Sequence, residues 1–233
     1  MKFKFLSVLT GIITAGFFAT SCSNDLNSDY YTPVESAAYG YIVNASPNSG
    51  DLYFYADQNL LNSTALNYGN SAGYYRFYLG DRTFSIKSSA GTSLATTSLK
   101  LSNQDYFGLF AVNTFNNIEL VAYRDTLVQP AAGNARVRFI NLIPDSPELD
   151  VATPSASLAT GLSFKEATDF IEVAAGTYDI AFKNAGTGTV ITTDTAETFN
   201  AGYIYTIYVK GYISPATGSN DTATAVKLTN YRG

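Results

Sequence analysis

The sequence predicts an all-β protein, with two tandem immunoglobulin-like β-sandwich domains that follow a signal peptide and a short tether. Three observations predict this class. Tyr and Phe are abundant while only 14% of the residues are charged, a composition that favours strands. Segments of alternating polar and apolar residues are separated by turns. A series of sequence markers also occurs twice in the same order, which indicates a duplicated domain.

The first residues have the form of a cleaved export signal. Lys2 and Lys4 precede an apolar segment at 5–19, which is too short to span a bilayer comfortably. Small residues then lead to Cys22, the only cysteine. This pattern resembles the bacterial lipobox, in which the chain is cut before the cysteine and that cysteine is diacylated. We therefore expect residues 1–21 to be removed and Cys22 to attach the protein to a membrane through two acyl chains.

Residues 22–36 are polar and rich in turn-forming side chains, so we interpret them as a lipidated tether that reaches at most about 50 Å. Without residues 1–21, which hold two lysines, 12 basic and 19 acidic side chains remain and the net charge is −7. This balance argues against nucleic acid and anionic lipid as partners. Membrane attachment is expected through the lipid on Cys22, in the cell envelope, and Ser23 after the cysteine favours the outer membrane.

Beyond the tether, the repeated markers place a first domain at 37–129 and a second at 134–233, with a Pro- and Gly-containing linker between them. The markers are 44–49 recurring as 141–146, 84–86 as 178–180, 90–92 as 185–187, and 123–124 as 231–232.

Each copy is predicted to form about seven short strands, as in an immunoglobulin-like sandwich. Val137 and Phe139 alternate with Arg136 and Arg138, which places the two arginines on the outward face of a half-buried strand. Turns are predicted at 144–146, 174–177 and 184–189, and a long β-prone run at 203–212. The nearest candidate for a helix is 163–172, but its last part, 170–173, leads into the turn at 174–177 and is better interpreted as a strand.

The second copy resembles the bacterial envelope family known as domain of unknown function 4397. The residues that carry the resemblance are Ala135–Asn141, Pro144–Pro147, Leu149–Val151, Gly161–Phe164, Ala175–Tyr178 and the strand at 203–211. The first copy departs from the pattern, because Gly40 stands where Val137 does and Gly50 where Pro147 does. The resemblance implies a secreted or lipid-anchored β-sandwich, of a kind often described as an adhesion protein, and it supplies no catalytic residue.

Several kinds of chemistry are excluded by composition. The chain has no histidine, and its one thiol is expected to be acylated, so nucleophile–histidine systems and His- or Cys-ligated metals are absent. We expect no cofactor. The acidic group Asp145, Glu148 and Asp150 lacks the glycine and closing glutamate of an EF-hand loop, so we interpret it as turn and strand residues rather than a metal site. Paired carboxylates could hydrolyse glycosides, but the sequence selects no pair.

The candidate ligand-binding residues are the tyrosines Tyr39, Tyr41, Tyr53, Tyr55 and Tyr78, which occupy outward positions in the first copy. Their equivalents in the second copy include Arg136 and Arg138. If the first two strands are neighbours, the tyrosines form an exposed patch that could bind a glycan or a protein. Alternatively, the patch packs against the second domain or reflects only strand propensity.

These observations predict a non-catalytic protein of the cell envelope with a binding, adhesion or structural role and an unknown ligand. Two alternatives stay open. One is a carbohydrate-binding accessory lipoprotein of a glycan-uptake system, and the other is a carboxylate-dependent glycoside hydrolase.

Overall fold

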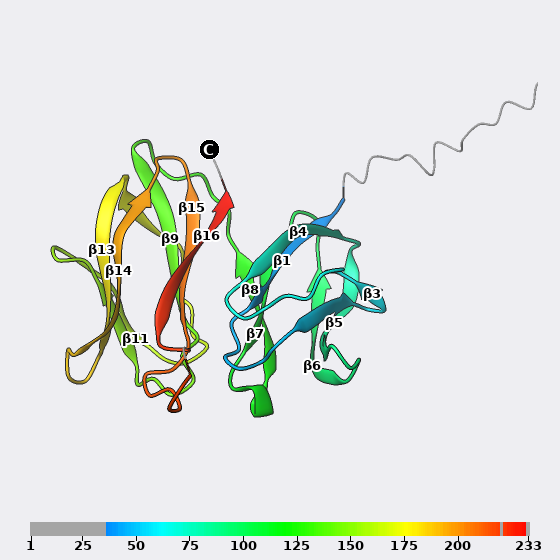
Figure 1. Cartoon of the computed structure of the whole chain (residues 1–233). Helices are drawn as coiled ribbons and strands as arrows, with labels where there is room; N and C mark the ends of the chain where they lie inside the picture. Colours follow the sequence, from blue (N-terminus) through cyan, green and yellow to red (C-terminus); the bar gives the residue numbers. More distant parts are fainter. Residues whose placement is uncertain (1–35, 220, 232–233) are drawn as a thin grey trace, which may run out of the picture. The chain divides into compact units, whose positions relative to one another are not determined.

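The computed structural model describes residues 36–219 and 221–231, and within these ranges the chain is all-β (Figure 1). Sixteen strands form four sheets of four strands, and the described residues hold one short 3-10 helix, Phe115–Asn117. The predicted signal peptide, Cys22 and the tether up to residue 35 lie outside the described residues. The prediction of an all-β, two-sandwich fold is confirmed.

The first sandwich contains strands β1 to β8. One of its sheets has the order β4-β1-β7-β8 and the other has the order β3-β2-β5-β6. The bounds are β1 Ala38–Asn44, β2 Leu52–Ala56, β3 Asn59–Leu60, β4 Ser71–Phe77, β5 Gly80–Ser88, β6 Ser93–Leu101, β7 Tyr106–Val112 and β8 Glu119–Asp125.

The second sandwich contains strands β9 to β16 and repeats the same plan. Its sheets have the orders β12-β9-β15-β16 and β11-β10-β13-β14, so every strand has its counterpart eight strands earlier. The bounds are β9 Asn134–Asn141, β10 Leu149–Ala152, β11 Ser157–Leu162, β12 Ile171–Ala174, β13 Gly176–Asn184, β14 Val190–Phe199, β15 Ile204–Lys210 and β16 Thr224–Tyr231. In both copies the first strand pairs in parallel with the seventh.

The strand count differs slightly from the expected one, because each copy has eight strands instead of about seven. The additional strands are short; β3, for example, has two residues. The segment after residue 170 forms strand β12, as predicted. The predicted turn at 184–189 joins β13 to β14, and the backbone N–H of Asn184 donates there to the Thr189 carbonyl at 2.9 Å.

Each sandwich buries its own aromatic core between its two sheets. Phe54, Phe84 and Phe107 are at most 1% exposed in the first copy, as are Phe139, Phe182 and Phe199 in the second. Packing explains why the first copy has a glycine, Gly40, at the position that Val137 occupies in the second copy. A Cβ on Gly40 would lie 2.7 Å from the Phe107 ring, so in the first copy this ring fills the space that a larger side chain would need.

The strongest repeat marker has a structural role in each copy. Asn44 and Asn141 are fully buried at the ends of β1 and β9. The Asn44 amide donates to the Leu66 carbonyl at 2.9 Å, and the Asn141 amide donates to the Leu162 carbonyl at 3.0 Å. In both copies the asparagine Oδ1 also accepts a backbone N–H two residues later. These asparagines therefore fix the turn that carries the chain from one sheet to the other.

The two sandwiches belong to one compact unit and share a third buried cluster. Strands β1, β7 and β8 of the first copy face β9, β15 and β16 of the second, as Figure 1 shows. The buried hydrophobic residues of this interface are Tyr41, Val43, Ala45, Phe110, Val112, Tyr123, Ile140, Leu142 and Tyr208. The same face of each copy is thus covered by the other, and the outer sheets with β2 and β10 remain on the far sides.

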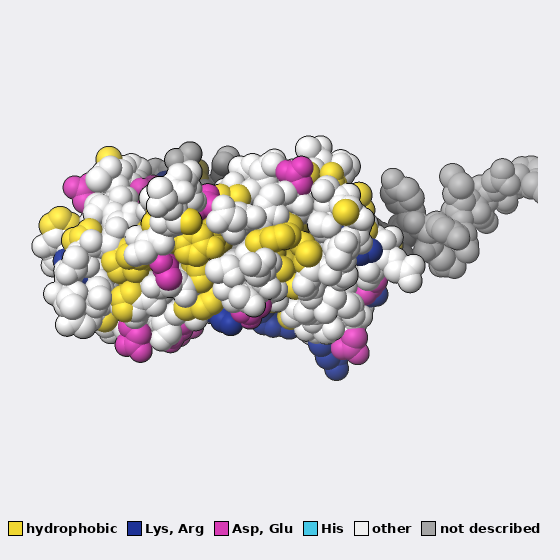
Figure 2. Space-filling model, turned by 60° about the horizontal axis from the view of Figure 1, so that its bottom comes forward, with side chains coloured by type: hydrophobic (Ala, Val, Ile, Leu, Met, Phe, Trp, Pro, Cys, Tyr) yellow, Lys and Arg dark blue, Asp and Glu magenta, His cyan; other side chains and the backbone are white. Residues whose placement is uncertain are grey.

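The surface carries few charges, in keeping with the composition. Figure 2 shows one face, on which hydrophobic side chains gather over the middle and charged side chains lie mostly towards the edges. Exposed apolar surface is therefore widespread, and a candidate site has to be argued from its shape and its lining residues.

Candidate functional site

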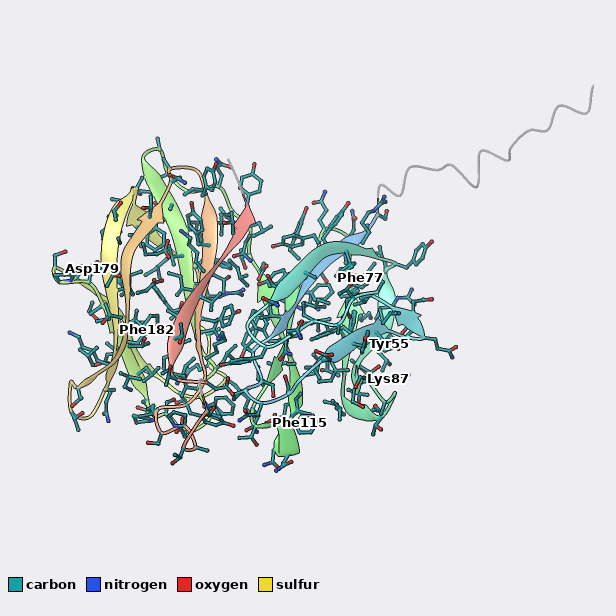
Figure 3. The ribbon with its side chains drawn as sticks, in the orientation of Figure 1. Tyr55, Phe77, Lys87, Phe115, Asp179 and Phe182 are labelled. Carbon is teal, nitrogen blue, oxygen red and sulfur yellow. The ribbon has the colours of Figure 1, made fainter. Side chains whose placement is uncertain are left out.

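The predicted tyrosine patch is divided between two faces of the first sandwich. The expectation that the first two strands are neighbours is wrong, because the turn after Asn44 moves the chain from the sheet of β1 to the sheet of β2. Tyr39 and Tyr41 on β1 therefore face the second sandwich. Tyr53 and Tyr55 on β2 lie on the opposite outer face, where the Lys87 ammonium is 4.3 Å from the centre of the Tyr55 ring (Figure 3).

Tyr41 is a packing residue and not an exposed ligand contact. Its side chain and that of its counterpart Arg138 were both expected on a solvent-facing side, yet Tyr41 is 5% exposed and Arg138 is 3% exposed. The reason is that the second sandwich covers this face. The Tyr41 ring lies across Gly108, its partner on β7, and meets the rings of Tyr74 and Phe110 edge-on.

Around Tyr41, polar side chains of both copies form a buried cluster. The Arg138 guanidinium donates to Asp125 Oδ1 at 2.6 Å, to Thr206 Oγ1 at 3.0 Å and to the Arg124 carbonyl at 2.8 Å. The Asn230 amide donates to Asp125 Oδ2 at 2.9 Å. Burial raises the pKa of the Asp125 carboxyl, and the adjacent guanidinium opposes that rise. The cluster joins the two sandwiches and does not resemble a catalytic arrangement.

A groove with a volume of about 230 Å³ lies next to this cluster, where the first and second sandwiches meet. It is lined by Tyr39, Tyr74, Tyr106, Leu127, Asn230 and Tyr231. We call it the tyrosine groove. Tyr74 is 40% exposed and Tyr231 is 43% exposed, so the ring surfaces are open to solvent.

The fold brings these side chains together from five separate segments. Parallel pairing of β1 with β7 sets Tyr39 beside Tyr106, and their rings stack with centroids 5.2 Å apart. Tyr74 comes from β4, and its hydroxyl donates to the Asn230 carbonyl at 3.3 Å. Tyr231 ends β16. Leu127 lies on the segment that joins the two sandwiches, so the groove requires both copies.

Of the five predicted residues, only Tyr39 lies in the tyrosine groove. Tyr78 is 75% exposed just after β4 and borders a different hollow with Asp57 and Arg82. The sequence reasoning missed Tyr74, Tyr106 and Tyr231 as site residues. Tyr231 belongs to one of the repeat markers, but that marker carries no indication of a binding role. Tyr106 becomes a neighbour of Tyr39 only through the parallel pairing of the first and seventh strands.

Asp145 and Asp150, two residues of the acidic group considered above, accept hydrogen bonds from backbone N–H groups. Asp145 accepts the backbone N–H groups of Ile213 and Ser214 at 2.9 and 3.0 Å, and Asp150 accepts that of Gly161 at 3.0 Å. Asp145 thus holds the loop that follows β15, and Asp150 bonds to the neighbouring strand β11. Among residues 36–219 and 221–231, no three metal-ligating side chains come together.

One carboxylate pair does interact directly, at the side of the second sandwich. Burial and the neighbouring Glu197 raise the pKa of Asp194 to about 6, while Lys227 forms an ion pair with Glu197. Glycoside hydrolysis needs two carboxyl groups about 5 Å or more apart with a sugar between them. Two carboxyl groups that bond to each other do not meet that requirement.

Comparison with solved structures finds distant likenesses. The fimbrial anchor protein Mfa2 from Porphyromonas gingivalis is 11% identical, with a TM-score of 0.24, over 83% of this chain and 97% of that one. A streptococcal virulence factor, from a structure described as alpha-glucan binding, is 15% identical, with a TM-score of 0.23, over 74% and 93%. The Bacillus anthracis TIE protein is 11% identical, with a TM-score of 0.23, over 83% and 44%. Likenesses at these TM-scores carry no functional argument.

No curated protein sequence matches this chain. In the part of the chain that the structure describes, no helix is both long enough and apolar enough to cross a membrane. The family model described as "Domain of unknown function (DUF4397)" matches residues 38–152 and 143–230, two overlapping segments that together span both sandwiches. The chain therefore belongs to the DUF4397 family.

Proposed function

We propose that this protein is a non-catalytic binding protein of the bacterial cell envelope, attached to the outer membrane by a lipid on Cys22. The observation that carries the binding role is the tyrosine groove, because open aromatic surface on a rigid scaffold is typical of recognition sites. The lipobox-like pattern before Cys22 supports the attachment. A polar tether followed by a double sandwich suits a protein held out from a membrane to contact a partner.

The lining of the groove supports binding without turnover. It contains no carboxylate, amine, thiol or imidazole, so no side chain there can act as a general base at neutral pH. Burial, with a contribution from Asp125, raises the pKa of the Tyr74 hydroxyl further above its ordinary value. Tyr74 therefore stays neutral, and the tyrosines of the lining offer ring faces and hydroxyl groups.

The buried interface supports a rigid binding surface. Arg138 and Asp125 come from different sandwiches, and their pairing, together with the shared apolar cluster, resists separation of the copies. A groove assembled from both copies needs that rigidity, because loss of the interface would move Tyr231 away from Tyr39. Preorganised surfaces lose less conformational entropy when they bind.

Attachment is tested by changing Cys22 to Ser in the native host. We expect wild type in the membrane fraction with incorporated palmitate, and Cys22→Ser without palmitate and no longer retained by membranes. Ser21→Ala keeps a small residue before the cysteine and serves as the matched control, with unchanged labelling. Equal membrane retention of Cys22→Ser and wild type would contradict the lipid anchor. Protease treatment of intact cells then shows whether the sandwiches face outward.

The carbohydrate-binding alternative is favoured by one specific observation, the uncharged, tyrosine-rich lining of the groove.

A further inference from the structure

We propose that the tyrosine groove binds an uncharged glycan, and that Tyr39, Tyr106 and Tyr231 supply the rings against which sugar units lie. The inference rests on the proposed binding function and assigns its ligand class. It depends on four properties of the groove: the chemistry of its lining, its charge, its size and its rigidity.

The lining combines apolar faces with polar tips. Four of its six residues are tyrosines, each with an aromatic ring that ends in a hydroxyl group, and Asn230 adds its polar groups. A pyranose ring has the complementary construction, with an apolar C–H face and hydroxyl groups at its edge. Binding sites are commonly apolar with a few well-placed polar groups. A purely hydrophobic ligand would leave the tyrosine hydroxyls without new partners, whereas sugar hydroxyls supply them.

The charge of the site selects against ionic ligands. None of the six lining residues carries a formal charge at neutral pH, so the groove offers no cation for a phosphate, sulfate or uronate. The mature chain has a net charge of −7, which repels anionic polymers at long range. An uncharged glycan needs no cation in the lining and is not repelled by the negative charge of the chain.

The size and openness of the groove favour a segment of a longer chain. Its volume of about 230 Å³ is below the roughly 300–1,000 Å³ of pockets that enclose small molecules. Tyr74 and Tyr231 are both exposed by two-fifths or more. A ligand would therefore lie in the groove with much of its surface in solvent, as one or two sugar units of a polysaccharide can.

Three of the four tyrosine rings, those of Tyr39, Tyr74 and Tyr106, are held in place before any ligand arrives. Tyr39 stacks on Tyr106 with an interplanar angle of 16°. Tyr74 is fixed by its hydrogen bond to Asn230 and by its edge-on contact with Tyr41, at a centroid distance of 5.2 Å. Little side-chain entropy remains to be lost at these positions on binding.

The test uses the full mature chain with Cys22→Ser, run on native gels that contain a polysaccharide. The neutral probes are dextran, starch, xyloglucan, mannan and galactomannan, and the acidic probes are polygalacturonate and alginate. We expect retardation by at least one neutral probe and by neither acidic probe. Tyr39→Ala and Tyr231→Ala should each weaken that binding about 2- to 10-fold. Tyr55→Ala and Tyr78→Ala, which change tyrosines outside the groove, are the matched controls and should bind like wild type.

Melting temperatures separate lost binding from lost folding, and only variants that melt near wild type are compared. The glycan proposal is overturned if no neutral probe retards the protein, if an acidic probe does so more strongly, or if well-folded Tyr231→Ala binds like wild type.

A second measurement separates this proposal from the proposed function. The immobilised protein is incubated with envelope fragments from the native host, treated beforehand with periodate or with protease. Loss of retention after periodate alone supports a glycan. Loss after protease alone overturns the glycan but leaves a binding function intact, with a protein ligand. No retention of untreated fragments contradicts the binding function itself.

Discussion

The Arg138 guanidinium donates to the Asp125 carboxylate at 2.6 Å across the junction of the two sandwiches, and both side chains are almost completely withdrawn from water. Two ions in this position are costly to bury, and their mutual attraction offsets the cost only while both are present. The pair therefore makes the fold sensitive to changes in either partner.

Arg138→Met is predicted to destabilise the protein by about 3–5 kcal/mol, because Asp125 is left buried without its counter-charge. Urea unfolding measures the change. The double variant Arg138→Met with Asp125→Leu should recover most of the loss, since an apolar pair can replace a buried ion pair. Arg124→Ala removes the more exposed pair with Asp105 and should cost less than about 1 kcal/mol. A single variant as stable as wild type would show that the pair does not hold the junction.

Gly108→Ala is predicted to destabilise the protein by about 1–3 kcal/mol. An added Cβ would overlap the Tyr41 ring, and that ring cannot retreat because Tyr74 and Phe110 pack against it. Gly176→Ala is the matched control on β13, because the nearest atoms to its Cβ would be 3.5 Å away. Thermal unfolding compares the two variants. Similar melting temperatures would mean that the Tyr41 ring is not confined as described.

Asp194→Asn is predicted to remove part of the pH dependence of stability. The pKa of the Asp194 carboxyl is about 6 in the folded protein, above its ordinary value of 3.8, so the folded state holds the proton more tightly than the unfolded chain. Wild-type stability from this group should therefore fall as the pH rises from about 4 to 6. The asparagine variant has no proton to lose there.

At pH 7, Asp194→Asn should be the more stable protein, by less than about 1 kcal/mol because the side chain is partly solvated. The advantage should shrink towards pH 4. Melting curves between pH 4 and 7.5 test this, with Asp169→Asn as a control at an exposed carboxylate of the same sandwich. A constant difference across that range would contradict a raised pKa at Asp194.

Changing Tyr53 and Tyr55 together to Ser is predicted to leave glycan affinity unchanged, because both lie on the sheet of β2, opposite the tyrosine groove. The half-buried contact between Tyr55 and Lys87 contributes about 0.5–1 kcal/mol, so the melting temperature should fall slightly. Native gels with the neutral probes and thermal unfolding report the two effects. Reduced binding by the well-folded double variant would move the site to the outer sheet.

The fold was predictable from the sequence because its signals are local and occur twice. The alternation around Val137 and Phe139, the asparagine before each sheet-crossing turn and the Gly-containing hairpin at 184–189 report strands and turns directly. Duplication doubled the signal. The departure of the first copy at Gly40 also has a cause in packing, through the Phe107 ring.

The site was not predictable to the same degree, because its residues meet through long-range pairing. Tyr39 lies 67 positions before Tyr106 and becomes its neighbour only through the parallel pairing of β1 with β7. The burial of Tyr41 depends on which faces of the two copies meet, and alternation along one strand cannot reveal that. Alternation along a strand shows which side chains point away from the core of their own sandwich, but not whether the other sandwich covers them.

The two copies cover each other with corresponding strands, β1, β7 and β8 against β9, β15 and β16. The junction therefore resembles the interface of a homodimer, in which the same surface of each subunit is buried against the other. A side chain on one of these faces needs a complementary partner on the other, as the buried Arg138 needs the carboxylate of Asp125. The outer sheets, with β2 and β10, have no partner sandwich against them, so a substitution on their outward faces changes no contact between the copies.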